Sequence, residues 1–341
     1  MKKRSLVASI STTLSCVVGA AFVGGNEIVR YFGGSIIAAV FFCALLLCSL
    51  LIVVTFCQRK GVTSIVELSK KLYKRESIAF LWVVSLCLFC VVIALYSTTS
   101  TCLSTLLNLH TNLPIFSVAT AIICFFVAKI GKRAVEKIAT VMLPVSVAFL
   151  VAAHLHGSCQ VDVNLVASWG GSITYCGYNV VPMLGVIAGG KQNKGTIAVA
   201  VALLALLCCM QVATTTSQAG LLPTLAAVAD SKLLFAWGVT SVYLSGLTSI
   251  LLCSMPVWEF LEQIVCDRVV VVASTTILAA ALSNFGFDKI ASICYPIIAL
   301  VGVISLIAMM FDSAKSKLIG ERARLSPAPS RKKIKKKKIK K

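Results

Sequence analysis

Long stretches of apolar residues recur along the whole chain, and they constrain its fold more than any other feature. Each stretch is predominantly apolar over about 18 residues or more, which as a helix is long enough to cross a bilayer core of about 30 Å. Lipid offers no partners to backbone amides and carbonyls, so such stretches must fold as helices. Only 13% of the 341 residues are charged, too few to cover a soluble domain of this size. The sequence therefore predicts an all-α integral membrane protein.

Hydropathy predicts ten spans, with boundaries good to a few residues. They cover about 7–32, 35–57, 78–107, 112–131, 134–156, 166–189, 196–217, 232–258, 268–285 and 288–311.

The distribution of Lys and Arg supports this count and sets the orientation. With the N-terminus inside, the internal loops carry most of the basic residues, namely Arg59, Lys60, Lys70, Lys71, Lys74, Arg75, Lys132, Arg133, Lys191, Lys194 and Arg268. The external loops hold almost none, with Lys232 and Lys289 at their edges. Positive charge marks the cytoplasmic side. We therefore predict a multi-pass protein of the inner (cytoplasmic) membrane with both termini in the cytoplasm.

The order of spans indicates a repeat of five helices. Residues of about 5–156 and 164–312 each hold five spans, and because five is odd the second half must run with inverted topology. In both halves a longer connector joins the second and third spans, at 61–74 and 217–230. Both connectors read as short amphipathic helices against the membrane face. The predicted core is 1–312; a chance match in loop length is the alternative explanation of the connectors.

The remaining residues, 313–341, form a basic tail that we expect to be disordered and cytoplasmic. Nine of the 32 basic residues lie in its last eleven positions, from Arg331 to Lys341. The tail fits either an anionic-lipid contact or a solvated topology anchor. A nucleic-acid binder would carry a basic folded face as well, and the charge pattern predicts none.

Two segments are predicted to interrupt their helices, and they occupy corresponding places in the two halves. The first, Val18 to Glu27 in the first span, contains three glycines; the second, Gly170 to Pro182 in the sixth, contains Gly177 and a proline that removes one amide. Glycine also serves close helix packing, so each segment alone is a weak signal. The matched pair is typical of a solute site near the membrane midplane between inverted repeats.

These same segments carry a family resemblance. The run from Val18 to Glu27 resembles the V-G-A-G-F-x-S-G-x-E stretch of the YkvI-type bacterial membrane proteins, with Ala21 and Gly24 as departures. Tyr175-Cys-Gly-Tyr178-Asn179 is similar to that family's aromatic pattern in helix six. The family belongs to the amino acid–polyamine–organocation superfamily with the LeuT-type fold. The resemblance implies a ten-helix transporter in a 5+5 inverted repeat, with helices one and six interrupted, and names no substrate.

The matched interruptions and the aromatic pattern predict the solute-binding residues. These are Gly19, Ala20, Phe22, Val23, Gly24 and Gly25 in helix one, Tyr96 in helix three, and Tyr175, Tyr178 and Asn179 in helix six.

The resemblance also implies a place for a coupling ion, because sodium in this fold joins carbonyls at the helix-one break to hydroxyls on helix eight. Ser245, Thr248 and Ser249 share one helical face in this sequence. With the carbonyls of Ser15 and Val18 they could supply five oxygens. The alternative is that these hydroxyls bond back to the preceding turn of their own helix, as is common in membrane helices.

Glu27 needs an explanation of its own, because an ionised carboxylate at membrane depth is costly. Three roles are open: a partner for Arg30 one turn on, a proton carrier, or a counter-charge for an amine. A solute carboxylate resting on amides around Val23 to Gly25 would meet Glu27 as a like charge. This conflict keeps an amine substrate open.

The sequence offers no enzyme chemistry. Its fifteen cysteines lie nearly all inside predicted spans, where cysteine acts as a small hydrophobe. Cys87 and Cys90 form a C-x-x-C within a span and lack further ligands, and no P-loop, nucleophile–base set or zinc spacing occurs. We predict a secondary transporter of a small polar solute, an amino acid or amine, coupled to sodium in preference to protons, with no other cofactor. A sensor or scaffold that reuses the fold is the alternative.

Overall fold

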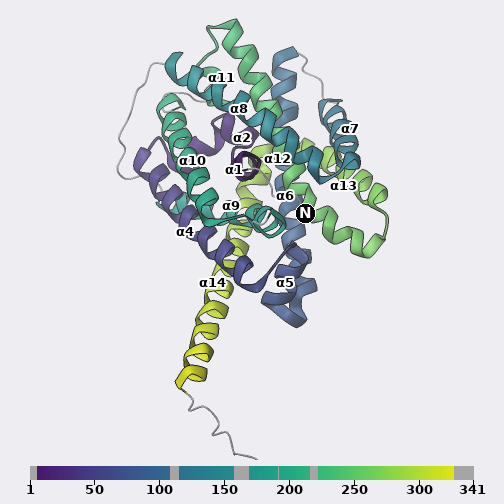
Figure 1. Cartoon of the computed structure of the whole chain (residues 1–341). Helices are drawn as coiled ribbons and strands as arrows, with labels where there is room; N and C mark the ends of the chain where they lie inside the picture. The colour runs from purple at the N-terminus through teal and green to yellow at the C-terminus, as the bar shows by residue number, and fades with distance from the viewer. Residues whose placement is uncertain (1–5, 108–114, 157–168, 191, 216–221, 326–341) are drawn as a thin grey trace, which may run out of the picture.

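The computed structural model describes residues 6–107, 115–156, 169–190, 192–215 and 222–325, which are helical throughout apart from short connections (Figure 1). The elements are α1 (Leu6–Val17), α2 (Ala20–Val23), α3 (Asn26–Phe32), α4 (Ile36–Lys60), α5 (Ile65–Tyr73), η1 (Lys74–Glu76), α6 (Ser77–Leu107), α7 (Ile115–Ile130), α8 (Lys132–His156), α9 (Trp169–Gly190), α10 (Lys194–Thr215), α11 (Pro223–Ala226), α12 (Lys232–Val265), α13 (Arg268–Leu282), η2 (Ser283–Phe285) and α14 (Phe287–Leu325).

Eight helices in the described ranges are long and apolar enough to cross a membrane. The apolar helices α1 and α7 are shorter and stand where the first and fourth spans were predicted. An α-helix rises about 1.5 Å per residue, so α7 with 16 residues spans about 24 Å, slightly less than the hydrocarbon core. The all-helical membrane fold is thus confirmed, and the count of ten spans stays a prediction.

Local sequence signals set several helix ends. Ser35, Ser64, Ser231 and Asp267 cap the N-termini of α4, α5, α12 and α13 by accepting hydrogen bonds from first-turn amides. A side-chain acceptor at this position satisfies an amide that has no partner within the helix. The chain therefore restarts each helix cleanly after its connection.

The first helix lies at the centre of the bundle. In Figure 1, α1 is surrounded by α8, α9, α10 and α12, and each of these packs against it. The helices of the two halves interleave, since α10 packs on α4 and α12 packs on α6 and α8. The break in helix one is therefore enclosed by protein on all sides and away from lipid.

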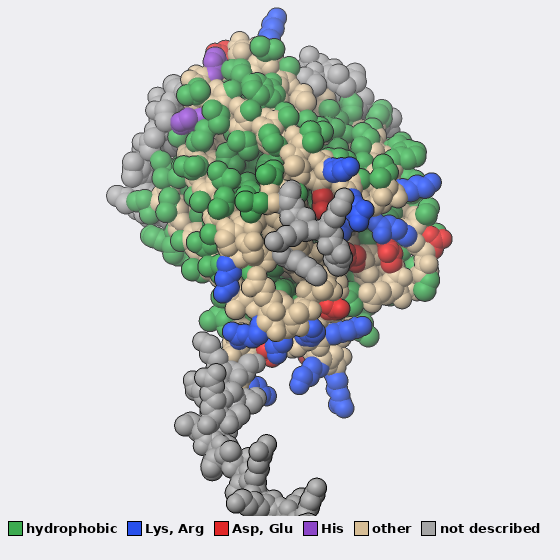
Figure 2. Space-filling view, in the orientation of Figure 1, with side chains coloured by type: hydrophobic (Ala, Val, Ile, Leu, Met, Phe, Trp, Pro, Cys, Tyr) green, Lys and Arg blue, Asp and Glu red, His purple; other side chains and the backbone are tan. Residues whose placement is uncertain are grey.

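One end of the molecule is basic. Figure 2 shows Lys and Arg gathered at the lower end of the bundle, where α5 and the nearby loops lie. Lys60 at the end of α4 pairs with Asp312 on α14 at 2.8 Å. The first predicted connector helix is present as α5, with Ile65, Val66 and Leu68 buried.

The second connector differs from expectation. Residues 216–221 lie outside the described residues, and the helix that follows, α11, has only four residues. Instead of lying on the membrane face, it sits on the helix-one break, where the Thr224 amide donates to the Gly24 carbonyl at 3.0 Å.

The predicted interruption of helix six is wrong. Helix α9 runs continuously from Trp169 to Gly190 with Pro182 inside it. Its glycines serve close packing instead, since a Cβ atom on Gly177 would lie 2.6 Å from the Ala299 carbonyl oxygen of α14. A Cβ on Gly302 of α14 would in turn lie 2.1 Å from the Gly177 carbonyl oxygen. Small residues that let two backbones touch are common where membrane helices cross.

The last helix is longer than predicted. Helix α14 continues to Leu325, beyond the expected end at Asp312, and Figure 1 shows it projecting from the bundle. Its 39 residues span about 58 Å, well over the hydrocarbon thickness. Residues 326–341, the rest of the expected disordered tail, lie outside the described residues.

Candidate functional site: a broken helix at the centre of the bundle

Helix one is interrupted where the sequence predicts it. Gly19 has an extended backbone between α1 and α2 (φ −88°, ψ −174°), and Gly25 lies between α2 and α3 with φ +88°. That positive φ is strained for any residue with a Cβ atom. The two glycines therefore divide one span into three short helices.

The inner break releases a carbonyl that another helix takes up. The Gly19 amide donates to Val17 at 2.9 Å, which leaves the Ser15 carbonyl without its usual partner four residues on. The Ser249 hydroxyl of α12 donates to that carbonyl at 2.6 Å. The first and eighth predicted spans, α1 and α12, thus meet through polar atoms in the apolar interior.

The outer break is satisfied by a buried glutamine. Gln211 of α10 donates its side-chain amide to the carbonyls of Phe22 at 2.8 Å and Val23 at 3.1 Å. Its oxygen accepts from the Thr224 hydroxyl at 3.2 Å. Helix α10, which is the seventh predicted span, and α11 together hold the outer break in place.

The structure brings together part of the predicted sodium set. The Ser15 carbonyl and Ser249 hydroxyl are in contact, and the Ser15 hydroxyl is buried with no partner among the described residues. Val18 is buried beside them at the end of α1. The other two hydroxyls turn elsewhere: Ser245 donates to Ser146 of α8 at 2.7 Å, and Thr248 bonds back to the Ser245 carbonyl at 2.9 Å. Back-bonding was the weighed alternative, and it holds for Thr248.

These oxygens suit a small hard cation. Such ions take oxygen ligands, and a buried hydroxyl without a partner is costly unless a ligand satisfies it. The Ser15 hydroxyl is such a group, and the carbonyl of the same residue is the one freed by the break. No cluster of three or more His, Cys, Asp or Glu able to hold a metal occurs in the ranges given above.

The third predicted span, α6, faces the break with Leu95 and Thr99 and not with the predicted Tyr96. A Cβ atom on Gly19 would lie 3.3 Å from Leu95, and one on Gly246 of α12 would lie 2.2 Å from Thr99 and 2.9 Å from Ala20. The Tyr96 side chain instead lies beside Cys124 and Tyr243, on the side of α7. In this conformation the helix turns Tyr96 towards α7, and its role in a solute site stays a prediction.

A carboxylate lies just outside the outer break, within a group of tyrosines. Glu27 of α3 is 3% exposed; it accepts from the Tyr175 hydroxyl of α9 at 2.7 Å and, more weakly, from the Tyr295 hydroxyl of α14 at 3.5 Å. Tyr178 is also buried here, and Asn179 bonds back to the Tyr175 carbonyl. Arg30, the partner weighed for Glu27, has an exposed side chain. Three helices thus meet at one carboxylate.

The backbone at Gly24 and Gly25 is covered in this conformation. A Cβ atom on Gly24 would lie 2.6 Å from the Leu222 side chain, and one on Gly25 would lie 2.7 Å from Thr215 and 2.8 Å from Thr224. The amides of Val23, Gly24 and Gly25, which were predicted to receive a solute carboxylate, donate instead to the carbonyls of Gly19, Ala20 and Phe22.

The same end of the molecule carries a histidine contact. His156 at the end of α8 lies 3.0 Å from the Asp230 carboxylate just before α12, and this hydrogen bond lowers the pKa of the Asp230 carboxyl below its ordinary value. His154 lies 3.5 Å from the Thr214 hydroxyl. These contacts link α8, the fifth predicted span, to the two ends of the connection between α10 and α12.

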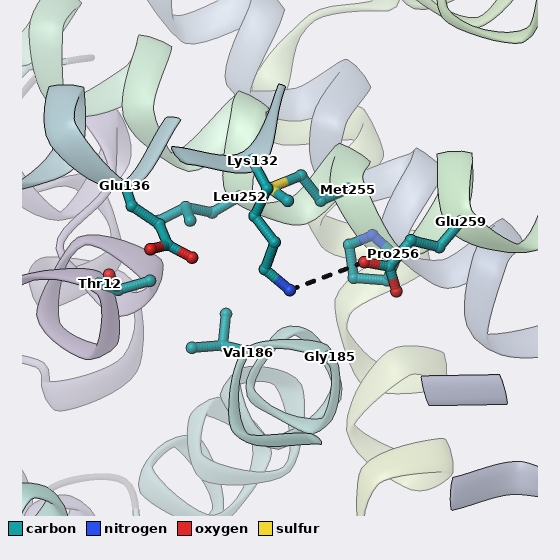
Figure 3. A pocket seen from close by; sticks show the side chains of 9 residues that line it. All are labelled: Thr12, Lys132, Glu136, Gly185, Val186, Leu252, Met255, Pro256 and Glu259. Atoms are coloured by element: carbon teal, nitrogen blue, oxygen red, sulfur yellow. Dashed lines mark ion pairs between the residues drawn. The ribbon is translucent and has the colours of Figure 1, made fainter. Parts of the chain in front are cut away.

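A hollow opens at the other end of the helix-one region. It is small, with a volume of about 20 Å³, and is lined by α1, α8, α9 and α12. Figure 3 shows Lys132 between Glu136 and Glu259, with Thr12 beside Glu136. The Lys132 ammonium pairs with Glu259 at 3.7 Å and donates to the Gly189 carbonyl at 3.4 Å, near the C-terminus of α9. A cation is favoured at that helix end.

Sequence reasoning missed several of these groups. Gln211 could have been noticed as an uncharged polar residue inside an otherwise apolar span. Tyr295 and Leu95 gave no signal, since an aromatic or apolar residue in a membrane helix is ordinary. Lys132 and Glu259 were assigned only to loop charge, and their pairing needs the three-dimensional fold.

Gln211 gives a direct test of how the outer break is stabilised. We expect Gln211→Leu to lower the free energy of unfolding by about 1–3 kcal/mol, because the buried Val23 carbonyl loses its side-chain donor and the Phe22 carbonyl keeps only the Gly25 amide. Thermal unfolding of the purified protein measures this, with Gln263→Leu on the exposed side of α12 as control. Equal stability of both variants would show that the break does not need this donor.

Lys132 gives a test of the hollow lined by α1, α8, α9 and α12. We expect Lys132→Met to speed thiol labelling of Thr12→Cys by up to about fivefold, because a half-exposed ion pair stabilises closure by no more than ~1 kcal/mol. Arg268→Met is the matched control, since it removes another ion pair of α12, with Glu262 at 3.3 Å, away from the hollow. An unchanged labelling rate would contradict the expectation that the Lys132–Glu259 ion pair holds the hollow closed.

The labelling requires a suitable background. Cys48 and Cys266 are the exposed cysteines among the described residues, and both are replaced by serine in all variants. A membrane-impermeant reagent then reports on the introduced thiol.

Comparison with solved structures gives the fold. The chain superposes on a Na⁺-coupled sialic acid symporter in a substrate-bound outward-open state with a TM-score of 0.65, over 90% of this chain and 78% of the symporter, at 9% sequence identity. The fold is that of the LeuT-type transporters. No family model and no curated protein matches the sequence. At an identity this low, the superposition establishes a shared architecture alone. The interrupted first helix at the centre of the bundle agrees with that architecture.

Proposed function

We propose that the chain is a secondary active transporter of a small polar solute, an amino acid or amine, coupled to sodium and working by alternating access. The observation that carries the proposal is the break in helix one, whose freed Ser15 carbonyl and unpartnered Ser15 hydroxyl lie beside Ser249 of helix eight. Backbone polar groups at membrane depth are left in such a state only where they line a cavity or an ion site.

The coupling ion is supported by two separate lines of argument. The oxygen groups fit a hard cation, and the fold is shared with a symporter that is Na⁺-coupled. A sodium ion between helices one and eight would replace the direct contact of Ser249 with Ser15. Binding there would favour one orientation of helix one over another, which is how an ion gradient drives a conformational cycle.

The conformation described here fits a state closed at the Glu27 end. Glu27, Tyr175 and Tyr295 meet there, while the hollow around Lys132 lies at the opposite end. With the basic end in the cytoplasm, this corresponds to a carrier closed to the outside. Membership of the YkvI-type family, location in the inner membrane with both termini inside, and anionic-lipid contact of the basic tail belong to the same proposal.

Two measurements test the function on the full chain. Purified protein is heated with and without sodium, with potassium as control, and we expect sodium alone to raise the melting temperature. Proteoliposomes with an inward sodium gradient are then screened for concentrative uptake of amino acids and amines. Failure of both would overturn the transporter and favour the sensor or scaffold that reuses the fold.

A further inference from the structure

Glu27 and the surrounding tyrosines form a cluster that the ion site does not use. Four of the seven tyrosines of the chain gather around this carboxylate from three helices, namely Tyr31, Tyr175, Tyr178 and Tyr295. We refer to Glu27 with these four residues as the tyrosine cluster. Its position is one turn from the outer break of helix one, beside the backbone segment where the solute site was predicted.

The rings of the tyrosine cluster are stacked rather than scattered. Tyr31 stacks on Tyr175 with centroids 4.9 Å apart, and Tyr178 stacks on Tyr295 at 4.0 Å. Tyr175 and Tyr178 are also near parallel, at 5.8 Å. Aromatic faces carry partial negative charge, so rings next to a carboxylate create a site that attracts cations and repels anions.

The polar and charged groups near Glu27 also favour a cation over an anion. Its two oxygens accept from neutral hydroxyls, those of Tyr175 and Tyr295. Arg30 lies on the next turn with an exposed side chain, and its charge acts on Glu27. An ammonium group carries three donors and a full positive charge, so it could replace both hydroxyls at the carboxylate with a stronger interaction.

The neighbouring backbone gives no comparable place to an anion. Gly24 and Gly25 are packed against Leu222, Thr215 and Thr224, and their amides already donate to the carbonyls of Ala20 and Phe22. A carboxylate placed beside these residues would also lie close to Glu27. The polar group of the solute that this region recognises is therefore a cation.

We propose that the tyrosine cluster binds the ammonium group of the transported solute, which assigns the substrate to amines and amino-group-bearing compounds. This inference rests on the proposed transport function. When α3 moves away from α9 and α14, the two tyrosine hydroxyls leave Glu27 and the ammonium group takes their place. Without an ammonium ligand, the hydroxyls return and close the cluster.

Three probes of equal carbon number separate charge from apolar contact: n-butylamine, butyrate and n-butanol. Each is added to the purified full-length protein in sodium buffer, and the melting temperature is recorded. We expect n-butylamine alone to raise it. Stabilisation by butyrate or n-butanol to the same extent as by n-butylamine would overturn the proposal.

Variants place the effect at the cluster. Glu27→Gln keeps the side-chain size and should abolish the shift with n-butylamine while keeping the shift with sodium, which shows that the protein is folded. Tyr178→Phe keeps the ring and should retain the amine shift, whereas Tyr178→Leu should reduce it. These two carry the test if Glu27→Gln does not fold.

The outcomes separate the two proposals. A sodium shift without an amine shift, or an amine shift that survives Glu27→Gln, overturns the ammonium site and leaves the transporter standing. Absence of both shifts overturns the ammonium site and counts against the sodium-coupled transporter as well.

Discussion

Ser249→Ala should remove the sodium response of the protein. The hydroxyl of Ser249 on α12 donates to the Ser15 carbonyl of α1 at 2.6 Å. A hydrogen-bonding group that serves an ion contributes about 1.5–3 kcal/mol, so the apparent sodium affinity should fall by about ten- to a hundredfold. The measurement is the rise in melting temperature with increasing sodium, which requires no knowledge of the solute.

Thr248→Ala is the matched control for this experiment. Thr248 precedes Ser249 in the same helix and is equally buried, but its hydroxyl bonds back to the Ser245 carbonyl at 2.9 Å. Its loss should leave the sodium response close to that of the wild type. A response that depends on Thr248 and not on Ser249 would contradict the proposed ion site.

Gly177→Ala should strongly destabilise the fold. The added Cβ atom would lie 2.6 Å from the Ala299 carbonyl oxygen, so the backbones of α9 and α14 would have to separate. Overpacking of this kind costs about 1–3 kcal/mol and occasionally more. Unfolding can be followed with a thiol-reactive fluorophore, because most of the free cysteines in the described residues are buried and react only when helices separate.

The same helix supplies the control. A Cβ atom on Gly170 would meet nothing within 4 Å, and alanine in a helix is otherwise favoured over glycine by up to about 1 kcal/mol. We therefore expect Gly170→Ala to keep or raise the melting temperature. If Gly177→Ala did the same, the close approach of α9 and α14 would not be required for stability.

The two glycine-rich segments show how far the sequence could predict this fold. In helix one the glycines do break the helix, at Gly19 and Gly25. In helix six the same residue type allows close packing, and the helix is continuous. Both uses produce the same pattern in a single sequence. The difference depends on which backbone lies opposite, and that is known only from the tertiary structure.

The candidate site was predictable to a similar extent. Ser15 and Ser249, which the family resemblance grouped at a sodium site, do lie in contact, and the binding of an ion there stays a prediction. Periodicity could not show that Thr248 bonds back to its own helix, or that Tyr96 turns towards Cys124. It also could not bring Tyr295 to Glu27, since the two are 268 positions apart. Long-range partners of this kind depend on how the helices pack.

The hydrogen bond from Thr224 to Gly24 has a consequence for how the proposed transport could be inhibited. Helix α11 is largely buried, with Ala226 exposed at its end, and it is one hydrogen bond away from the backbone that would rearrange in the proposed transport cycle. An antibody fragment that binds the exposed residues Ala226, Ala229 and Asp230 would hold α11, and with it the outer break of helix one, in place. Such a reagent should inhibit the proposed transport without competing with the solute or the ion.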